Sequence, residues 1–420
     1  MDFSPSQAAA EYRHRVAEFI AREIEPVEAE YHRSLRGLDD PWVVLPVIDE
    51  LKGKARAEGL WNLFLPPASD GSGMSHVDYA PLAELMGRSF IAPEIFNCNA
   101  PDTGNAEVLL HYGSQYQRKQ WLEPLLEGRI RSAFCMTEPD VASSDATNMA
   151  ATAVADGDEV VLNGRKWFST GVGHPNCGFV IFMAVTDADA HRHARHSMVI
   201  VPTDAPGFRV ERMLPVFGYR DEPYGHGEVT FTDVRVPREN VVAGLGRGFE
   251  IAQGRLGPGR VHHCMRLIGL AERALELALR RGTERVAFGK PLANLGGNRE
   301  RIARARIEIN QARLLVLHAA WLLDTQGIAG AYSEVSQIKA AVPEMAERVI
   351  DTAMRMHGAA GFTDDVPLAA AFANARSLRM ADGPDEVHLG VVARNELAPY
   401  QEAARARDAA GADPTEKGAG

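Results

Sequence analysis

The spacing of apolar residues divides the chain into helical, strand-like and again helical stretches. From about residue 6 to 130, apolar positions recur at helical spacing between Pro and Gly breaks, as in Val77–Met86 and Ala106–Trp121. This pattern predicts amphipathic helices. Near residue 132 the pattern changes to short apolar runs bounded by Pro, Gly or Asp, and from Gly248 the helical period returns.

The middle stretch predicts an all-β unit that ends near residue 242. Asp156-Gly157-Asp158 is a tight-turn signal between two short strands. The other strand-like runs are Val180–Met183, Met198–Val201 and Val229–Thr232.

Three apolar stripes at helical spacing follow, within residues 267–278, 302–323 and 338–356. Pro343 lies in the third stripe, where it predicts a kink or a late helix start. We therefore predict a helical domain of residues 1–131, a central β domain of 132–245 and a helical bundle of 246–402. Residues 403–420 are mostly small or charged, which predicts a disordered tail.

Composition narrows the class of protein. The chain is 45% hydrophobic and 24% charged, as in globular proteins, and its net charge of −11 argues against a nucleic-acid partner. No apolar run approaches the ~20 residues that a membrane span requires. The N-terminal helical pattern is rich in Glu, unlike a targeting peptide, and four widely separated cysteines suit reduced thiols. We expect a cytoplasmic protein.

Two other patterns invite a ligand but predict none. His262-His263-Cys264 and the His-rich segment 191–196 do not have the spacing of a metal site, because adjacent helical residues do not converge on one ion. The glycine-rich segment Gly244–Gly248 is followed by helices and not by a βαβ unit, so it reads as a flexible junction.

Candidate chemistry lies in two runs of the middle stretch. The first is Ala133–Pro139, closed by Ser143-Ser144-Asp145, and the second is Asn163–Gly171. Hydroxyls, backbone N–H groups beside a Pro and an aromatic residue shortly before a Thr suit an isoalloxazine ring. Such a ring needs donors along its pyrimidine edge and N5 and a flat apolar surface on one face. A Thr-Glu-Pro turn alone is also ordinary loop chemistry.

Together, in this order, the two runs resemble the flavin-binding segments of the acyl-CoA dehydrogenase family. The resemblance covers roughly residues 10–400. It implies that family's α+β multidomain fold: an N-terminal helical domain, a central β-barrel domain and a C-terminal four-helix bundle. Residues 134–146, 253–260 and 381–388 are similar to the branch whose larger eukaryotic members are fused to a kinase-like domain. This chain would correspond to the dehydrogenase module alone.

The resemblance implies FAD as the cofactor. Phe168 would pack on the flavin, Thr170 would donate near N5, and Thr137 with the Met136 backbone would serve the pyrimidine edge. Arg285 and Phe288 match an Arg-x-x-Phe-Gly motif that reaches the FAD pyrophosphate of a neighbouring subunit. The implied cofactor contacts are Phe134, Met136, Thr137, Ser144, Phe168, Ser169, Thr170, Arg285, Phe288, Arg355, Gly358, Ala359, Pro384 and Glu386.

The segment Ala381–Glu386 matches the position where most family members carry Glu-Gly-Thr, the Glu being the catalytic base. Asp382 would be the base here. Another branch places the base before an Arg that matches Arg260, but that position is Gly259, which carries no proton. Arg355 and Pro384 replace the usual Gln and Thr. The implied substrate contacts are Ser144, Gly257, Arg260 and Gly383.

The implied reaction is the α,β-dehydrogenation of an acyl-CoA thioester to a trans-2-enoyl-CoA, within fatty-acid β-oxidation. Asp382 would remove the α-proton, the β-hydrogen would pass to flavin N5 as hydride, and electrons would leave to an electron-transfer flavoprotein. The family implies a homodimer or homotetramer, and the branch implies medium or long acyl chains, including 4-hydroxylated forms. Two alternatives stay open: a flavin oxidase or monooxygenase on the same fold, and a non-catalytic family member.

Overall fold

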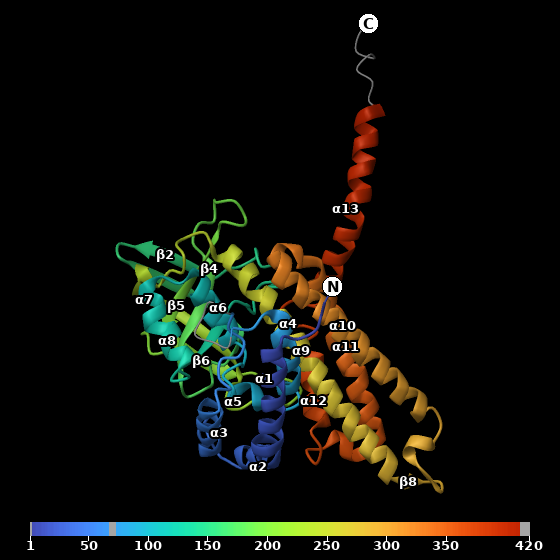
Figure 1. The fold of residues 1–420 in the computed structure, drawn as a ribbon. Helices are drawn as coiled ribbons and strands as arrows, with labels where there is room; N and C mark the ends of the chain where they lie inside the picture. The colour runs from blue at the N-terminus through green and yellow to red at the C-terminus, as the bar shows by residue number, and fades with distance from the viewer. Residues whose placement is uncertain (1, 67–72, 412–420) are drawn as a thin grey trace.

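The N-terminal part of the chain is helical (Figure 1). The computed structural model describes residues 2–66 and 73–411, without the side chains of residues 256 and 408–411. Serine N-caps begin three of the helices: Ser6 accepts from Ala9 N, Ser75 accepts from Asp78 N, and Ser114 forms a capping box with Gln117. The helices are α1 (Gln7–Phe19), α2 (Glu25–Arg36), α3 (Pro46–Ala57), α4 (His76–Met86), α5 (Ala92–Ile95), α6 (Asp102–Tyr112), α7 (Gln115–Gln117) and α8 (Glu123–Leu126).

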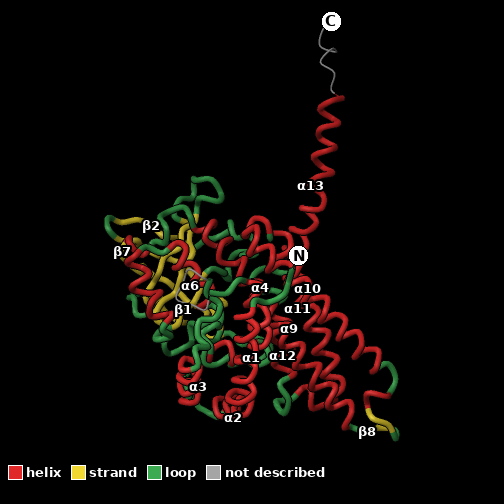
Figure 2. The backbone as a smooth tube through the Cα atoms, viewed as in Figure 1, coloured by secondary structure: helices red, strands yellow, loops and turns green. Residues whose placement is uncertain are grey.

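The middle of the chain is a seven-stranded sheet, drawn in yellow in Figure 2. Its path is β1-β4-β2-β3-β7-β6, with β5 paired to β4; β1 and β4 are parallel. Strand β1 also lies against β3, so the sheet curls around an apolar core of its own. The strands are β1 (Arg131–Cys135), β2 (Thr152–Asp156), β3 (Glu159–Thr170), β4 (Cys177–Val185), β5 (His196–Pro202), β6 (Phe208–Met213) and β7 (His226–Pro237).

Long helices form the C-terminal part. Helices α9, α10 and α11 pack against one another, and α12 and α13 pack on α11. The short hairpin of β8 (Val286–Ala287) and β9 (Lys290–Pro291) lies at the outer tip of this bundle, and α13 extends beyond the body of the molecule (Figure 1). The helices are α9 (Gly248–Glu284), α10 (Asn298–Gly330), α11 (Tyr332–His357), α12 (Leu368–Ser377) and α13 (Asp385–Gly411).

One apolar core joins the N-terminal helices to the bundle, while the sheet keeps a separate core. Two glycines bring α4 and α9 into backbone contact. A Cβ on Gly269 would lie 1.8 Å from the carbonyl oxygen of Glu84, and one on Gly87 would lie 2.0 Å from that of Arg266. This close packing sets which face of α9 is turned toward the rest of the molecule.

The structure corrects two expectations. Helix α11 runs through Pro343, so the alternative of a late helix start at that residue is wrong. Residues 403–411 belong to α13 and not to a disordered tail, while residues 412–420 lie outside the described part of the chain. The predicted hairpin at Asp156–Asp158 and the three further strand-like runs are confirmed as parts of β2, β3, β4, β5 and β7. The proposed domain limits stay predictions.

Among the described residues, no helix has the length and apolar content needed to cross a bilayer. All four cysteines are buried and unpaired. No cluster of His, Cys, Asp and Glu side chains suited to a metal ion occurs in the described part of the chain.

Candidate active site

The segment between α12 and α13 presents Asp382 in a left-handed turn. Asp382 has φ 57° and Gly383 has φ 106°. Asp tolerates this region better than most residues. A Cβ on Gly383 would lie 2.8 Å from Nε2 of His388, so glycine is needed there for both conformation and space.

Two cationic side chains, one of them buried, hold this turn by its carbonyl groups. Arg260 Nε donates to the carbonyl oxygen of Asp382 at 3.0 Å. Lys339 Nζ donates to the carbonyl oxygens of Leu378 at 2.5 Å and Gly383 at 3.2 Å. The turn is therefore anchored to both α9 and α11. The backbone N–H of Asp382 has no hydrogen-bond partner within residues 2–66 and 73–411.

The Asp382 carboxylate lies among positive groups. Burial raises its pKa, but the contact with His263 and the charges of Arg255, Arg260 and Lys339 lower it by more, so the pKa ends below its ordinary value. His263 Nε2 lies 3.4 Å from Asp382 Oδ2. Burial and Arg266 lower the pKa of His263 to about 4. At neutral pH the pair is thus a carboxylate beside a neutral imidazole, and Asp382 is in the form that can accept a proton.

The other acidic groups near this turn have different surroundings. Asp385 accepts from Arg379 Nε at 2.6 Å, so its carboxylate is engaged in an ion pair. Glu386 is exposed in the first turn of α13, where an acidic residue complements the helix dipole. Pro384 is the residue before that helix.

The segment after β1 offers backbone donors. The N–H groups of Met136 and Thr137 have no hydrogen-bond partner among the described residues. Lys166 holds their segment in place. Its Nζ donates to the carbonyl oxygens of Met136 at 2.9 Å and Met183 at 2.7 Å, and to Glu138 Oε1 at 2.7 Å. Both members of the Lys166–Glu138 ion pair are buried.

A β-bulge at the end of β3 turns Phe168 outward. The pairing of β3 with β7 shifts between Lys166 and Ser169, and Phe168 has φ 49°. Its side chain is 44% exposed, an open apolar face beside Thr170, while Ser169 is buried. Thr170 Oγ1 lies 2.9 Å from His226 Nδ1, and His226 Nε2 lies 2.9 Å from Asp221 Oδ2.

A cleft of about 490 Å³ lies between the sheet and the bundle. Ser144 of the sheet domain lines it, as do Gly257 and Arg260 of α9. Arg192 and Arg394 line it too and supply further positive charge, which suits a phosphorylated ligand. Because Arg260 also holds the Asp382 carbonyl, the cleft and the carboxylate are adjacent.

Arg255, also on α9, contacts residues of α6 and β1. Its guanidinium is 4.0 Å from the ring centroid of Phe134, and a Cβ on Gly104 would lie 3.2 Å from Cζ. Arg255 is nine-tenths buried, yet among the described residues its one hydrogen bond is from Nε to Asn105 Oδ1 at 3.1 Å. Burial lowers its pKa.

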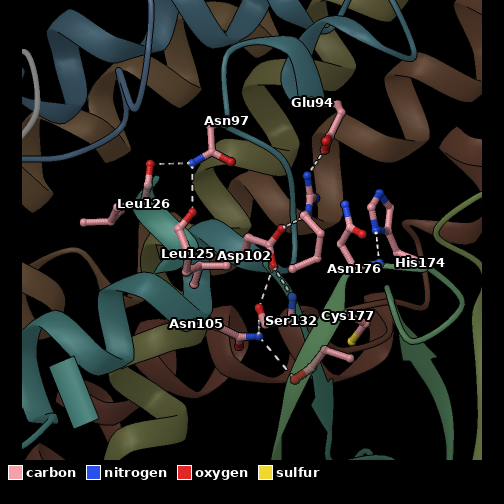
Figure 3. Close-up of polar contacts among 12 residues, drawn as sticks. Glu94, Asn97, Asp102, Asn105, Leu125, Leu126, Ser132, His174, Asn176 and Cys177 are labelled. Carbon is pink, nitrogen blue, oxygen red and sulfur yellow. Dashed lines mark hydrogen bonds and ion pairs between the residues drawn. The ribbon is translucent and has the colours of Figure 1, made fainter. Parts of the chain in front are cut away.

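A buried polar network continues from Asn105 (Figure 3). Asn105 Nδ2 donates to Ser132 Oγ at 2.8 Å, and the Ser132 N–H donates to Asp102 Oδ1 at 2.8 Å. Asp102 and Glu94 both pair with the buried Arg131 of β1. The network ties α5, α6 and β1 together beneath Phe134 and so fixes the strand from which the Met136–Thr137 segment begins.

Comparison with known proteins decides the family. Models of the N-terminal, middle and C-terminal domains of acyl-CoA dehydrogenases match residues 6–129, 133–234 and 246–397. The chain belongs to the acyl-CoA dehydrogenase family.

Curated relatives agree. The chain is 54% identical over 397 residues to mouse acyl-CoA dehydrogenase family member 10, covering 93% of this chain and 37% of that protein. It is 51% identical over 400 residues to the probable acyl-CoA dehydrogenase FadE2 of Mycobacterium tuberculosis, covering 94% and 97%. The chain thus spans about a third to a half of the animal relatives that it matches. The predicted family, its branch and its oxidoreductase class are confirmed.

Solved structures show the same fold. A protein described as an acyl-CoA dehydrogenase from Mycobacterium abscessus is 67% identical, with a TM-score of 0.93 and coverage of 94% of this chain and all of that chain. Butyryl-CoA dehydrogenase from Megasphaera elsdenii is 26% identical, with a TM-score of 0.80 and coverage of 94% and 100%. The predicted acyl-CoA dehydrogenase fold is confirmed, and this family is one of flavoproteins.

The predicted site residues fall into two groups. One group lies near Asp382 and the cleft, as described above, and the other lies at the far end of the bundle. Arg285 and Phe288 are exposed at the outer tip of the bundle, and Arg355, Gly358 and Ala359 are exposed at the end of α11. These two ends meet, since a Cβ on Gly282 would lie 2.6 Å from Met356 Cε.

Within one acyl-CoA dehydrogenase chain, Arg285 lies 25 residues beyond Arg260, close to the last turn of the same helix. That separation corresponds to about 38 Å of helical rise. Arg355 forms an ion pair with Asp351 at 2.6 Å and remains exposed. Arg285 and Arg355 therefore cannot contact the same ligand atoms as Asp382 within a single chain.

Three groups at the site were missed by reading the sequence. His263 was set aside with His262 as a poor metal motif, yet it contacts Asp382. The available signal was the three-residue spacing from Arg260 to His263, which puts both on one helix face. Arg255 and His226 carried no local signal, because their neighbours come from other elements.

Proposed function

We propose that this chain is an FAD-dependent acyl-CoA dehydrogenase with Asp382 as its base. The observation that carries the proposal is the position of Asp382, an ionised carboxylate held by Arg260 at the edge of a 490 Å³ cleft with basic residues in its walls. Such a cleft suits the phosphates of a CoA thioester, and Ser144 and Gly257 lie in its wall.

The residues present fit a flavin. The N–H groups of Met136 and Thr137, unpaired within the described part of the chain, provide donors for a pyrimidine edge. The exposed ring of Phe168 provides a flat apolar face beside the Thr170 hydroxyl. Phe134 and Ser169 belong to the same two segments. A bound flavin supplies a hydride acceptor.

In the proposed reaction Asp382 removes the α-proton of the thioester. The backbone N–H of Asp382, which is unpaired among the described residues, would donate to the thioester oxygen as negative charge develops there. Exclusion of water by the acyl chain raises the pKa of a carboxylate, so substrate binding would make Asp382 a stronger base. Gly383, beside it, is proposed to contact the substrate.

Arg255 supports a substrate with an oxygen-bearing acyl chain, as the branch implies. Its guanidinium carries five N–H donors, and one of them is paired within the described residues. A plain hydrocarbon chain next to this buried group would leave its remaining donors without acceptors, which is costly. We therefore propose medium or long acyl-CoAs, including 4-hydroxylated forms.

The proposed assembly is a homodimer or homotetramer in the cytoplasm that passes electrons to an electron-transfer flavoprotein. The position of Arg285, Phe288, Arg355, Gly358 and Ala359 at the exposed end of the bundle supports contacts to the ADP half of a neighbouring subunit's FAD. Pro384 and Glu386, at the start of α13, are proposed to border the flavin next to the base.

The test is anaerobic mixing of the flavin-loaded protein with a panel of acyl-CoAs, plain and 4-hydroxylated, while flavin bleaching is recorded. We expect bleaching in the wild type and a loss of at least ~10²-fold in rate for Asp382→Asn, which keeps the size but cannot accept the proton. Asp385→Asn is the matched control and should stay within a few-fold of wild type. A fully active Asp382→Asn would refute the assignment, and fast reoxidation of reduced flavin by oxygen would favour an oxidase.

A further inference from the structure

Three residues of α9 form a row along the face turned toward Asp382. Arg260, His263 and Arg266 follow one another at three-residue spacing, so each side chain is next to the following one on the helix surface. Arg260 holds the Asp382 carbonyl group, and His263 lies against the Asp382 carboxylate. Arg266 lies against His263.

The contacts determine which imidazole nitrogen carries the proton. Arg266 Nη2 lies 3.2 Å from His263 Nδ1. A guanidinium can donate but cannot accept, so Nδ1 must be the acceptor and the proton of a neutral imidazole must sit on Nε2. That nitrogen is the one 3.4 Å from Asp382 Oδ2. The row thus places an N–H donor near one oxygen of the carboxylate.

We propose that His263 is a positioning residue for Asp382: its Nε2–H, oriented by Arg266, hydrogen-bonds Oδ2 and leaves Oδ1 free to take the substrate proton. The inference rests on the proposed function, since it presumes that Asp382 is the base. The 3.4 Å separation is longer than a formed hydrogen bond, and such catalytic contacts commonly shorten when substrate binds.

A neutral donor is well suited to this position. Asp is one methylene shorter than Glu, so its carboxylate needs to be held in one orientation to reach the substrate. A second full charge in direct contact with the carboxylate would hold its pKa lower and weaken the base. Burial together with Arg266 keeps the pKa of His263 near 4, so His263 is neutral at pH 7.

Charged groups around the pair come from each element packed against it. Arg255, Arg260 and Arg266 belong to α9, and Lys339 comes from α11. On the α4 side Tyr79 faces Arg266, with a pKa that burial raises well above its usual value. His388 of α13 lies 3.2 Å from the Asp382 carbonyl oxygen, with a pKa that burial lowers to about 4. Glu107 of α6 interacts with Arg255, and burial raises its pKa to about 7. The pH profile of each His263 variant is therefore compared with that of the wild type, which has the same surrounding groups.

The test uses His263→Leu, which removes the donor, and His263→Gln, which keeps an N–H donor of similar reach. Single-turnover flavin reduction is recorded against pH together with acyl-CoA affinity. For His263→Leu we expect a rate loss on the order of 10²-fold, the typical cost of a misplaced catalytic group, with affinity changed less than a few-fold. The acid limb of its pH profile should move to higher pH, because the carboxylate loses a hydrogen bond that stabilises its charged form.

His263→Gln should recover much of the rate and of the acid limb. If His263→Leu instead has the wild-type rate and pH profile, the proposal is overturned. If the leucine variant does not fold, the glutamine variant still tests the proposal. Glutamine keeps an N–H donor, so a His263→Gln variant as slow as Asp382→Asn would also overturn the proposal.

A second measurement does not depend on activity. Melting temperatures of His263→Leu, Asp382→Asn and the double variant form a cycle. The two single shifts should not add in the double variant, because the second change removes a contact already lost. Additive shifts would overturn the contact. If none of the acyl-CoAs bleaches the wild-type flavin but the cycle is non-additive, the proposed function is refuted while the His263–Asp382 contact is supported.

Discussion

Replacement of Lys166 by Met tests whether the flavin-binding segment depends on a buried charge. Lys166 has a side chain that is 0% exposed, and its Nζ donates to two carbonyl oxygens and to Glu138. Burial lowers the pKa of Lys166, and Glu138 opposes that shift. Methionine fills a similar volume but provides no donor, so Lys166→Met would leave the buried Glu138 carboxylate without its cation.

Breaking a buried ion pair in this way typically costs about 3–5 kcal/mol. Glu138 also accepts from the backbone N–H groups of Ala150 and Ala151, at 2.7 and 3.1 Å, and these bonds would remain. The loss should therefore fall toward the lower end of that range. The Met136 carbonyl would lose its Lys166 partner too, so FAD retention should fall along with stability.

The matched control is Lys54→Met. Lys54 pairs with Glu23 at 2.6 Å, but its side chain is 54% exposed, and exposed pairs contribute about 1 kcal/mol or less. The assay is thermal and urea unfolding followed by circular dichroism, with flavin content measured after gel filtration. The double variant Lys166→Met/Glu138→Gln should recover part of the loss, because it removes the stranded charge.

The reasoning would be refuted by a Lys166→Met variant that unfolds at the same temperature and urea concentration as Lys54→Met. If the double variant recovers no stability, the unpaired Glu138 charge is not the source of the stability lost in Lys166→Met.

Two further predictions concern pH and the cofactor. Burial, followed by Arg131, lowers the pKa of His174 from 6.5 to about 3, so the unfolded chain binds a proton that the folded chain does not. Stability should then fall as pH drops from about 6.5 toward 3, and the melting temperature of His174→Gln should fall less steeply over that range. Arg285→Ala should lose FAD on dilution while its circular dichroism stays native, since Arg285 is exposed. A monomer with one tightly held FAD would contradict the second prediction.

Much of the local structure followed from spacing along the chain. The Asp156–Asp158 turn signal predicted the β2–β3 hairpin, because turn residues act on their immediate neighbours. The alternative of a late helix start at Pro343 was wrong, since the buried face of α11 maintains the helix through that residue. The expectation of disorder for residues 403–411 was wrong as well, because Ala and Arg favour a helix even where few apolar groups are buried.

The candidate site divides in the same way. The motif order alone placed Asp382, Phe168, Thr170 and Arg260 in one family of flavoproteins, which the comparisons confirm. The motif order did not show which residues contact Asp382. His263, which lies against the Asp382 carboxylate, is distant from it in sequence, and Arg260, which holds the Asp382 carbonyl group, is 122 residues away.

The sequence by itself determined the order of helical and strand segments and the chemical types available in each, because hydrophobic period and turn residues act locally. The tertiary structure decided which groups meet. Glycines 87 and 269 allow α4 and α9 to touch, the packing of α9 on α11 turns His263 toward Asp382, and a bulge in β3 exposes Phe168. Those contacts depend on how elements far apart in the chain pack, and no local pattern encodes that.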